Sequence, residues 1–146
     1  MGEVVWITGG GSGLGLGMAK VYAARGARVA VSGRRVDRLE EAVAAIQAAG
    51  GEGLAVPCDV TKDQQHAVDT ILARWGRLDT AVANAGYAVG GRFEEVPLDQ
   101  FRRQIEVNVV GAAETARVAL PHLQQADGRL AFVASVAGFL GLPKNS

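Results

Sequence analysis

The chain has 146 residues, of which 49% are hydrophobic and 21% are charged, a size and composition typical of one globular domain over residues 1–146. Lys plus Arg and Asp plus Glu number 15 each, so no excess of positive charge favours nucleic acid or an anionic membrane as a partner. One cysteine, Cys58, cannot form an internal disulfide, and with only two histidines beside it no metal site is expected. No apolar run is long enough to span a bilayer and no leader is recognisable, so we expect a cytoplasmic protein that acts on a small molecule.

Short β-like runs alternate with runs of helical periodicity along the whole chain, which predicts an α/β fold with a parallel sheet. The first strand is expected at 3–8, and a glycine cluster leads from it into a helix at 13–25 that ends at Gly26. Further strands are expected at 28–32, 53–57, 78–84 and 129–135.

Three more helical segments are expected between these strands. The second helix carries an apolar face of Val36, Leu39, Val43 and Ile46. The third is expected to begin with a capping box formed by Thr61 and Gln64. A long helical stretch covers about 98–125, and one interpretation is that two helices meet near Asn108.

This order of elements predicts a doubly wound parallel sheet. We expect right-handed crossovers to place the first helices on opposite faces of the sheet. A ligand crevice is expected at the carboxyl ends of the strands, where the strand order reverses. The polar residues that fall at this end are Thr8, Ser32, Asp59, Asn84 and Ser135.

The run TGGGSGLGLG, from Thr8 to Gly17, stands between the first strand and the first helix. A turn of this kind lets backbone N–H groups and the helix N-terminus face an anion. Gly9 suits a tight turn, Gly13 lets a phosphate approach the backbone, and Gly15 lets the helix pack closely. We therefore expect nucleotide binding through this loop, including Ser12 and Leu14, rather than a flexible turn without a ligand.

The run SGRR follows the second strand and contains Ser32, Arg34 and Arg35. A carboxylate in this region binds the ribose hydroxyls of NAD, whereas an arginine accommodates the 2′-phosphate of NADP. Here Gly33 stands where a carboxylate is expected, so the sequence favours NADP over NAD. The alternative is two solvated arginines at a helix start, where positive charge is mildly unfavourable.

Two further segments are candidates for cofactor contacts. Asp59, with Val60 after it, could accept a hydrogen bond from an adenine amino group or serve a local turn. The small residues around Asn84 and Gly86 permit close approach of a cofactor, and Asn84 could equally pin neighbouring strands together.

Together the motifs TGGGSGLG, SGRR, CDV, ANAG, NV at Asn108 and ASVAG around Ser135 resemble the short-chain dehydrogenase/reductase family, in its order and approximate spacing. The resemblance implies a Rossmann fold of about seven strands, of which five are present, a nicotinamide cofactor, and hydride transfer between an alcohol and a ketone. It implies that Asp59 contacts adenine with Val60 beside it, and that Asn84 and Gly86 line the cofactor. It also implies that Ser135 binds the substrate oxygen, that Asn108 holds a water of the proton relay, and that the full-length form is a homo-oligomer.

One departure from the family pattern bears on mechanism. The family's acid/base is a tyrosine about a dozen residues after the serine, with a lysine four residues further on. The only tyrosines are Tyr22 and Tyr87, neither of which matches, and no tyrosine stands four residues before Lys144. We therefore expect that the sequence stops about two residues before this tyrosine, and that the chain by itself lacks normal turnover.

Two alternatives from other functional classes stay open. One is a non-catalytic nucleotide-binding or interaction module derived from the same family. The other is a nucleotide-fold transferase with a methyl donor, which is disfavoured by Arg34 where an acidic ribose-binding residue is expected.

Overall fold

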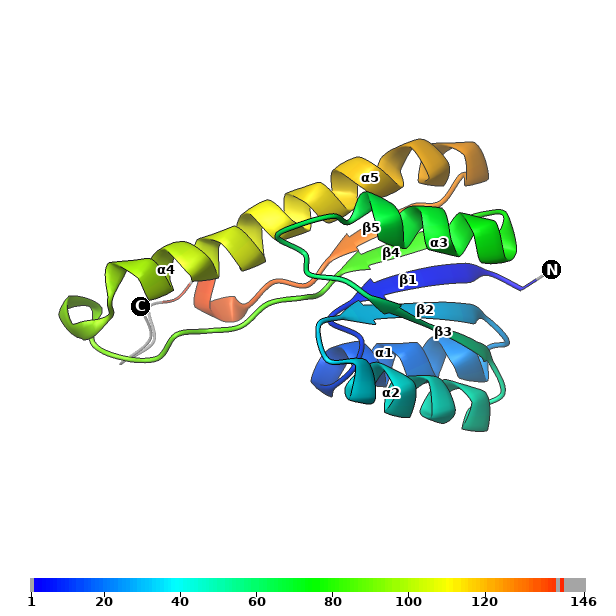
Figure 1. Cartoon of the computed structure of the whole chain (residues 1–146), viewed down its shortest axis with the longest axis horizontal. Coiled ribbons are helices and arrows are strands. Elements are labelled where there is room, and N and C mark those ends of the chain that lie inside the picture. The colour runs from blue at the N-terminus through cyan, green and yellow to red at the C-terminus, as the bar shows by residue number, and fades with distance from the viewer. Residues whose placement is uncertain (1, 139, 141–146) are drawn as a thin grey trace.

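The computed structural model describes residues 2–138 and 140 (Figure 1). The strands are β1 (Val4–Thr8), β2 (Arg28–Gly33), β3 (Glu52–Pro57), β4 (Thr80–Ala83) and β5 (Arg129–Phe132). The helices are α1 (Gly13–Ala24), α2 (Val36–Ala48), α3 (Gln65–Trp75), α4 (Leu98–Ile105) and α5 (Gly111–Ala126). A π-helical turn, η2 (Glu106–Val110), joins α4 to α5, and short 3₁₀ turns lie at η1 (Phe93–Glu95) and η3 (Val136–Gly138).

All strand pairs within the described residues are parallel, and the order across the sheet is β3-β2-β1-β4-β5. The predicted α/β class with a doubly wound parallel sheet is confirmed. The chain moves outward from β1 through β2 to β3 and then crosses back to β4, so the order reverses between β1 and β4. The carboxyl ends of these two strands, which point to the left in Figure 1, form the switch point at which open α/β sheets bind ligands.

The expected placement of the first helices on opposite faces is wrong. Helices α1 and α2 cover one face of the sheet, and α3 and α5 cover the other (Figure 1). The reason is that β1, β2 and β3 follow one another in the same direction, so two right-handed crossovers place both helices on the same side. Only the reversal from β3 to β4 carries α3 to the opposite face.

The side chains of β1 alternate between the two halves of the core. Val5 and Ile7 pack with α1 and α2, whereas Val4 and Trp6 pack with α3 and α5. Every residue of β1 is buried. This central position holds Thr8, at the end of the strand, and the glycine loop after it in a fixed place.

Two local expectations differ from the structure, and a third is confirmed. The capping box is absent, because Thr61 Oγ1 donates to Asp59 Oδ1 and the Gln64 side chain turns into the protein interior. Strand β5 ends at Phe132 rather than at Ser135, since its ladder with β4 ends where β4 ends. The interpretation that two helices meet near Asn108 is confirmed, because α4 ends at Ile105, α5 begins at Gly111, and the π turn between them contains Asn108.

None of the helices in the part of the chain that the structure describes has both the length and the apolar character needed to cross a membrane.

At the amino ends of the strands, Asp79 joins β1 to the loop before β4. Its Oδ2 accepts a hydrogen bond from the Val4 N–H at 2.8 Å, and its carboxylate pairs with Arg77. Burial raises the pKa of Asp79, but the hydrogen bonds from Arg77 and Val4 outweigh burial and hold the pKa below its ordinary value. The ionised form therefore stabilises the fold.

Replacing Asp79 by alanine is expected to lower the free energy of unfolding by about 1–3 kcal/mol at pH 7, because the buried Val4 N–H loses its acceptor. A carboxylate with a lowered folded-state pKa stabilises above its unfolded pKa and loses that contribution as the pH falls. The difference between wild type and D79A should therefore shrink below about pH 3.8, the ordinary value of the group. Urea denaturation at several pH values measures it. The control is D69A on the exposed surface of α3, and an equal effect of the two variants would contradict the assignment.

Candidate functional site

The glycine loop between β1 and α1 packs tightly against its surroundings. Gly9 has a φ of +66°, and a Cβ there would lie 2.9 Å from the Cα of Ala85. Gly15 has no room for a side chain, because a Cβ would lie 2.5 Å from the Gly9 carbonyl oxygen and 2.6 Å from Asn84 Nδ2. These contacts give Gly9 and Gly15 the roles predicted for them, a tight turn and a close approach of helix to loop.

A hydrogen-bond network fastens this loop to β4. Asn84 Nδ2 donates to the Thr8 carbonyl oxygen at 2.8 Å, and Thr8 Oγ1 accepts from the backbone N–H groups of Asn84 and Ala85, both at 3.0 Å. Thr8 Oγ1 donates in turn to the Val82 carbonyl oxygen. Of the two interpretations of Asn84, the structure therefore supports a pin between strands, and contact with a cofactor stays a prediction.

The opposite side of the loop is open. Gly13 has a φ of +53°, and among the described residues no atom other than those of its chain neighbours and its own helix backbone lies within 4 Å of a Cβ placed there. Ser12 occupies the N-cap of α1 without a side-chain cap, and Leu14 is 62% exposed. The first N–H groups of a helix have no partners within the helix, so this surface can donate several hydrogen bonds to an anion.

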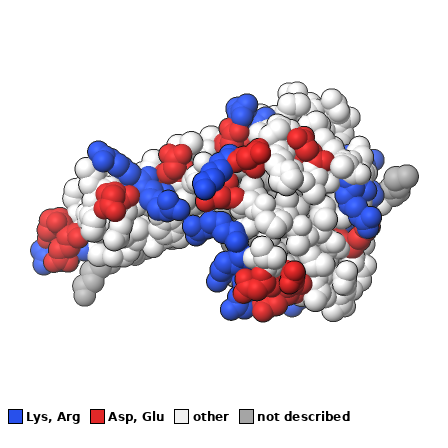
Figure 2. Space-filling model, viewed as in Figure 1, with Lys and Arg blue, Asp and Glu red and all other residues white. Residues whose placement is uncertain are grey.

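Positive charge gathers beside the open face of the loop. Arg34 and Arg35 are both exposed at the carboxyl end of β2, and Arg35 Nη2 lies 3.5 Å from Ser12 Oγ. Figure 2 shows Lys and Arg side chains at this end of the molecule, where the long helix of α4 and α5 projects beyond the sheet. The Arg35 guanidinium therefore lies beside the loop, and Arg34 precedes it directly and lies near Asp59.

Asp59 lies close to this group. Burial raises the pKa of Asp59. The hydrogen bonds from the Thr61 N–H and hydroxyl, together with the positive charge of Arg34, outweigh burial and hold the pKa below its ordinary value. Its Oδ1 is thus used by a local turn. The contact of Asp59 and the neighbouring, nearly buried Val60 with adenine stays a prediction.

Ser32 has a structural role in the described chain. Its side chain is 1% exposed, its Oγ accepts from Trp6 Nε1 at 3.0 Å, and its carbonyl oxygen accepts from the Gly10 N–H at 3.2 Å. Ser32 therefore holds the glycine loop through its backbone carbonyl oxygen. A direct contact of its hydroxyl with a cofactor is untested, and these partners do not support it.

Asn108 clamps the loop after β4 to the π turn. Its Oδ1 accepts from the Tyr87 N–H at 3.1 Å, and its Nδ2 donates to the Tyr87 carbonyl oxygen at 2.7 Å. A Cβ on Gly86 would lie 3.2 Å from Asn108 Oδ1, so the glycine permits this close contact. The part of Asn108 in a water-mediated proton relay stays a prediction, and its clamp on the backbone of Tyr87 could not be read from the sequence.

Ser135 lies three residues beyond β5 and is exposed. Its Oγ accepts from the Ala137 N–H at 3.1 Å, which leaves the hydroxyl proton available to a ligand oxygen. Tyr22 lies in α1 and Tyr87 in the loop after β4, as expected from the sequence.

Two hollows among the described residues lie at the amino ends of the strands. One, of about 320 Å³, lies around Glu3, Arg77 and Asp127, and the other, of about 300 Å³, around Leu72 and His122. Within the described residues, no three His, Cys, Asp or Glu side chains are grouped so that they could hold a metal ion.

A parallel sheet with this order, a glycine turn at its switch point and an open helix N-terminus define the dinucleotide-binding class of α/β proteins. The family model described as short chain dehydrogenase matches residues 3–146. The chain belongs to the short-chain dehydrogenase/reductase family.

Similar proteins include an uncharacterised oxidoreductase of Thermotoga maritima, 37% identical over 98% of this chain and 57% of that protein. NAD⁺-bound xylitol dehydrogenase superposes with a TM-score of 0.92 at 30% identity, over 97% of this chain and 56% of the other. An alcohol dehydrogenase of Thermococcus sibiricus in complex with 5-hydroxy-NADP gives a TM-score of 0.92 at 31% identity, over 99% and 63%. The chain spans about half the length of the curated relatives it matches.

Gly15 and Gly17 offer a matched test of the packed loop. G15A is expected to destabilise the fold by about 1–3 kcal/mol, because the new methyl group meets the Gly9 backbone and Asn84. The new Cβ of G17A, two residues on in the same helix, meets no other part of the described chain within 4 Å, and this variant is expected to stabilise by about 1 kcal/mol. Chemical denaturation measures both, and destabilisation by G17A as large as that by G15A would contradict this description of the loop.

Proposed function

We propose that this chain forms the cofactor-binding part of an NADP(H)-dependent oxidoreductase that acts on an alcohol or ketone. The observation that carries the choice of NADP(H) is the pair of exposed arginines, Arg34 and Arg35, after β2, of which Arg35 lies beside Ser12 of the glycine loop. NAD⁺ and an NADP derivative are each bound by one of the similar structures, so a nicotinamide dinucleotide agrees with both.

The residues of the site fit such a dinucleotide. The open backbone at Gly13 and the helix N-terminus would hold the pyrophosphate, with Ser12 and Leu14 at its edge. Arg34 and Arg35 would bind the 2′-phosphate, and a guanidinium group binds phosphate through parallel hydrogen bonds. Asp59 and Val60 would lie near adenine, while Asn84 and Gly86 would border the nicotinamide side.

A bound nicotinamide supplies the hydride donor or acceptor of the reaction. The Ser135 hydroxyl would donate a hydrogen bond to the carbonyl oxygen of the substrate and so orient it. Asn108 would contribute to a proton relay by holding a water beside the π turn. A serine hydroxyl by itself does not readily exchange its proton at neutral pH, so an acid/base group outside residues 1–146 would complete the reaction.

The assembly and location of the whole protein also belong to this proposal. The side chains of Val109 and Leu120 are 57% and 42% exposed along the long helix, in accord with a homo-oligomer of the full-length form. A cytoplasmic location stays a prediction.

NADPH is expected to bind at least tenfold more tightly than NADH, and the double variant R34A/R35A should lose this preference. The reason is that a charge-assisted hydrogen bond contributes about 1.5–3 kcal/mol, which is about 10- to 100-fold in affinity. Isothermal titration calorimetry with both cofactors measures the preference. R117A on α5 is the control, since it removes an arginine that lies beyond the site and should leave the preference unchanged. Tighter binding of NADH by the wild-type chain would overturn the choice of cofactor.

A chain of residues 1–146 alone is expected to bind NADPH without measurable oxidation of it in the presence of ketones. The physical reason is that it offers the substrate oxygen a hydrogen bond from Ser135 but no tyrosine at the family's offset. NADPH absorbance, recorded on protein whose intact mass is 15.1 kDa, checks this expectation. Turnover that disappears in S135A would show that these residues already contain a complete catalytic site.

A further inference from the structure

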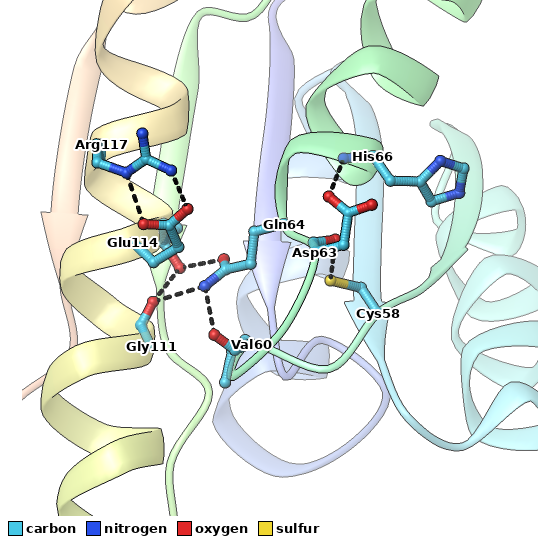
Figure 3. A network of polar contacts seen from close by, with 9 residues as sticks. Cys58, Val60, Asp63, Gln64, His66, Gly111, Glu114 and Arg117 are labelled. Atoms are coloured by element: carbon cyan, nitrogen blue, oxygen red, sulfur yellow. Dashed lines mark hydrogen bonds and ion pairs between the residues drawn. The ribbon is translucent and has the colours of Figure 1, made fainter.

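Gln64 is a fully buried polar side chain that the cofactor contacts do not use. Its Nε2 donates to the carbonyl oxygens of Val60 at 2.7 Å and of Gly111 at 2.8 Å, and its Oε1 lies 2.7 Å from Thr115 Oγ1. Figure 3 shows the Gln64 amide between Val60 and Gly111. Because a carbonyl oxygen can only accept, the two carbonyl partners fix the orientation of the amide, and Oε1 must accept from the Thr115 hydroxyl.

The first consequence concerns the segment after β3. Val60 packs directly on Gly111, where a Cβ would lie 2.8 Å from Val60 Cγ2. Together with the Gln64 amide, this contact fastens residues 59–64 to the start of α5. Asp59, the predicted adenine contact, is therefore held from the helix side as well as by its own turn with Thr61.

The second consequence concerns the π turn. The Gly111 N–H donates to the Glu106 carbonyl oxygen and closes that turn, while the Gly111 carbonyl oxygen is held by Gln64. Asn108 lies within the turn and clamps the backbone of Tyr87. Gly111 is thus the residue at which the buried network meets the turn that holds the loop after β4.

We infer that Gln64 is a positioning residue of the site, which through Gly111 fixes both the Asp59–Val60 segment and the π turn with its clamp on Tyr87. Only the link to a nicotinamide cofactor rests on the proposed function. The role in positioning the two segments rests on the contacts of the described chain.

Loss of the amide would not be a local event. Without it, the carbonyl oxygens of Val60 and Gly111 and the Thr115 hydroxyl lose partners in a dry interior, where an unpaired polar group is costly. The Thr115 hydroxyl also lies 2.9 Å from the Gly111 carbonyl oxygen, so it can satisfy only part of this loss. We expect the start of α5 to shift in response, and the π turn to shift with it.

Hydrogen exchange of the Tyr87 amide in the cofactor-free protein tests the inference. In Q64M and T115V the Tyr87 N–H is expected to exchange at least tenfold faster, because its clamp moves. T115S keeps the hydroxyl and should restore the wild-type rate. V118A is the control, since Val118 lies on the same helix and is buried in the core but belongs to no part of the network.

Wild-type exchange at Tyr87 in both Q64M and T115V would overturn the positioning role. If Q64M does not fold, the pair T115V and T115S decides the question. Should V118A, at an equal loss of stability, raise the Tyr87 rate as much as T115V does, the effect would be general loosening, and the inference would fail.

A second readout is the dissociation constant of NADPH. It is expected to rise about tenfold in Q64M and T115V and to stay within twofold of wild type in T115S and V118A. Wild-type affinity in both Q64M and T115V would refute the link to the cofactor. If the wild-type protein binds neither NADPH nor NADH, the proposed function fails, while the exchange experiment still decides the role of Gln64.

Discussion

The close contact of Gly15 with the Gly9 carbonyl and the Asn84 amide is the constraint on which the site depends. It brings the first turn of α1 against the end of β1 and against β4 at once. Since β1 and β4 are the strands between which the order reverses, this contact joins the two halves of the sheet at the switch point. The N-terminus of α1 therefore lies at the switch point, and the open backbone of Gly13 lies there with it.

The core explains why so much of this fold was readable in the sequence. Buried parallel strands are nearly continuous apolar runs. Val4–Thr8 is buried along its whole length, so its apolar run and the glycines that follow it predicted this strand clearly. The turn after α1 was equally clear, because Gly26 has a φ of +78°, a conformation that favours glycine. For the candidate site, Gly9 and Gly13 could be placed in the turn for the same reason, since both have a positive φ.

The features that sequence reasoning missed all depend on partners distant in the chain. Gln64 stands three residues after a threonine, which is a capping pattern, but its amide found better partners at Val60 and across the fold at Gly111. Asn108 was recognised at an irregularity in the helix, whereas the π turn and the Tyr87 backbone that it holds became visible only in three dimensions. To predict the face of the sheet on which α1 and α2 lie, the strand order is needed, and local sequence patterns do not contain it. Ser32 was placed correctly at the end of its strand, but its hydroxyl serves the indole of Trp6.

That last contact has an optical consequence. The indole of Trp6 is fully buried and donates a hydrogen bond to Ser32, two residues before Arg34. The other tryptophan, Trp75, is the last residue of α3. Indole emission and near-ultraviolet circular dichroism depend on the hydrogen bond and the rigidity of the ring. Trp6 is therefore an intrinsic chromophore that contacts Ser32, the residue that also holds the glycine loop. Trp75, at the end of α3, serves as an internal reference.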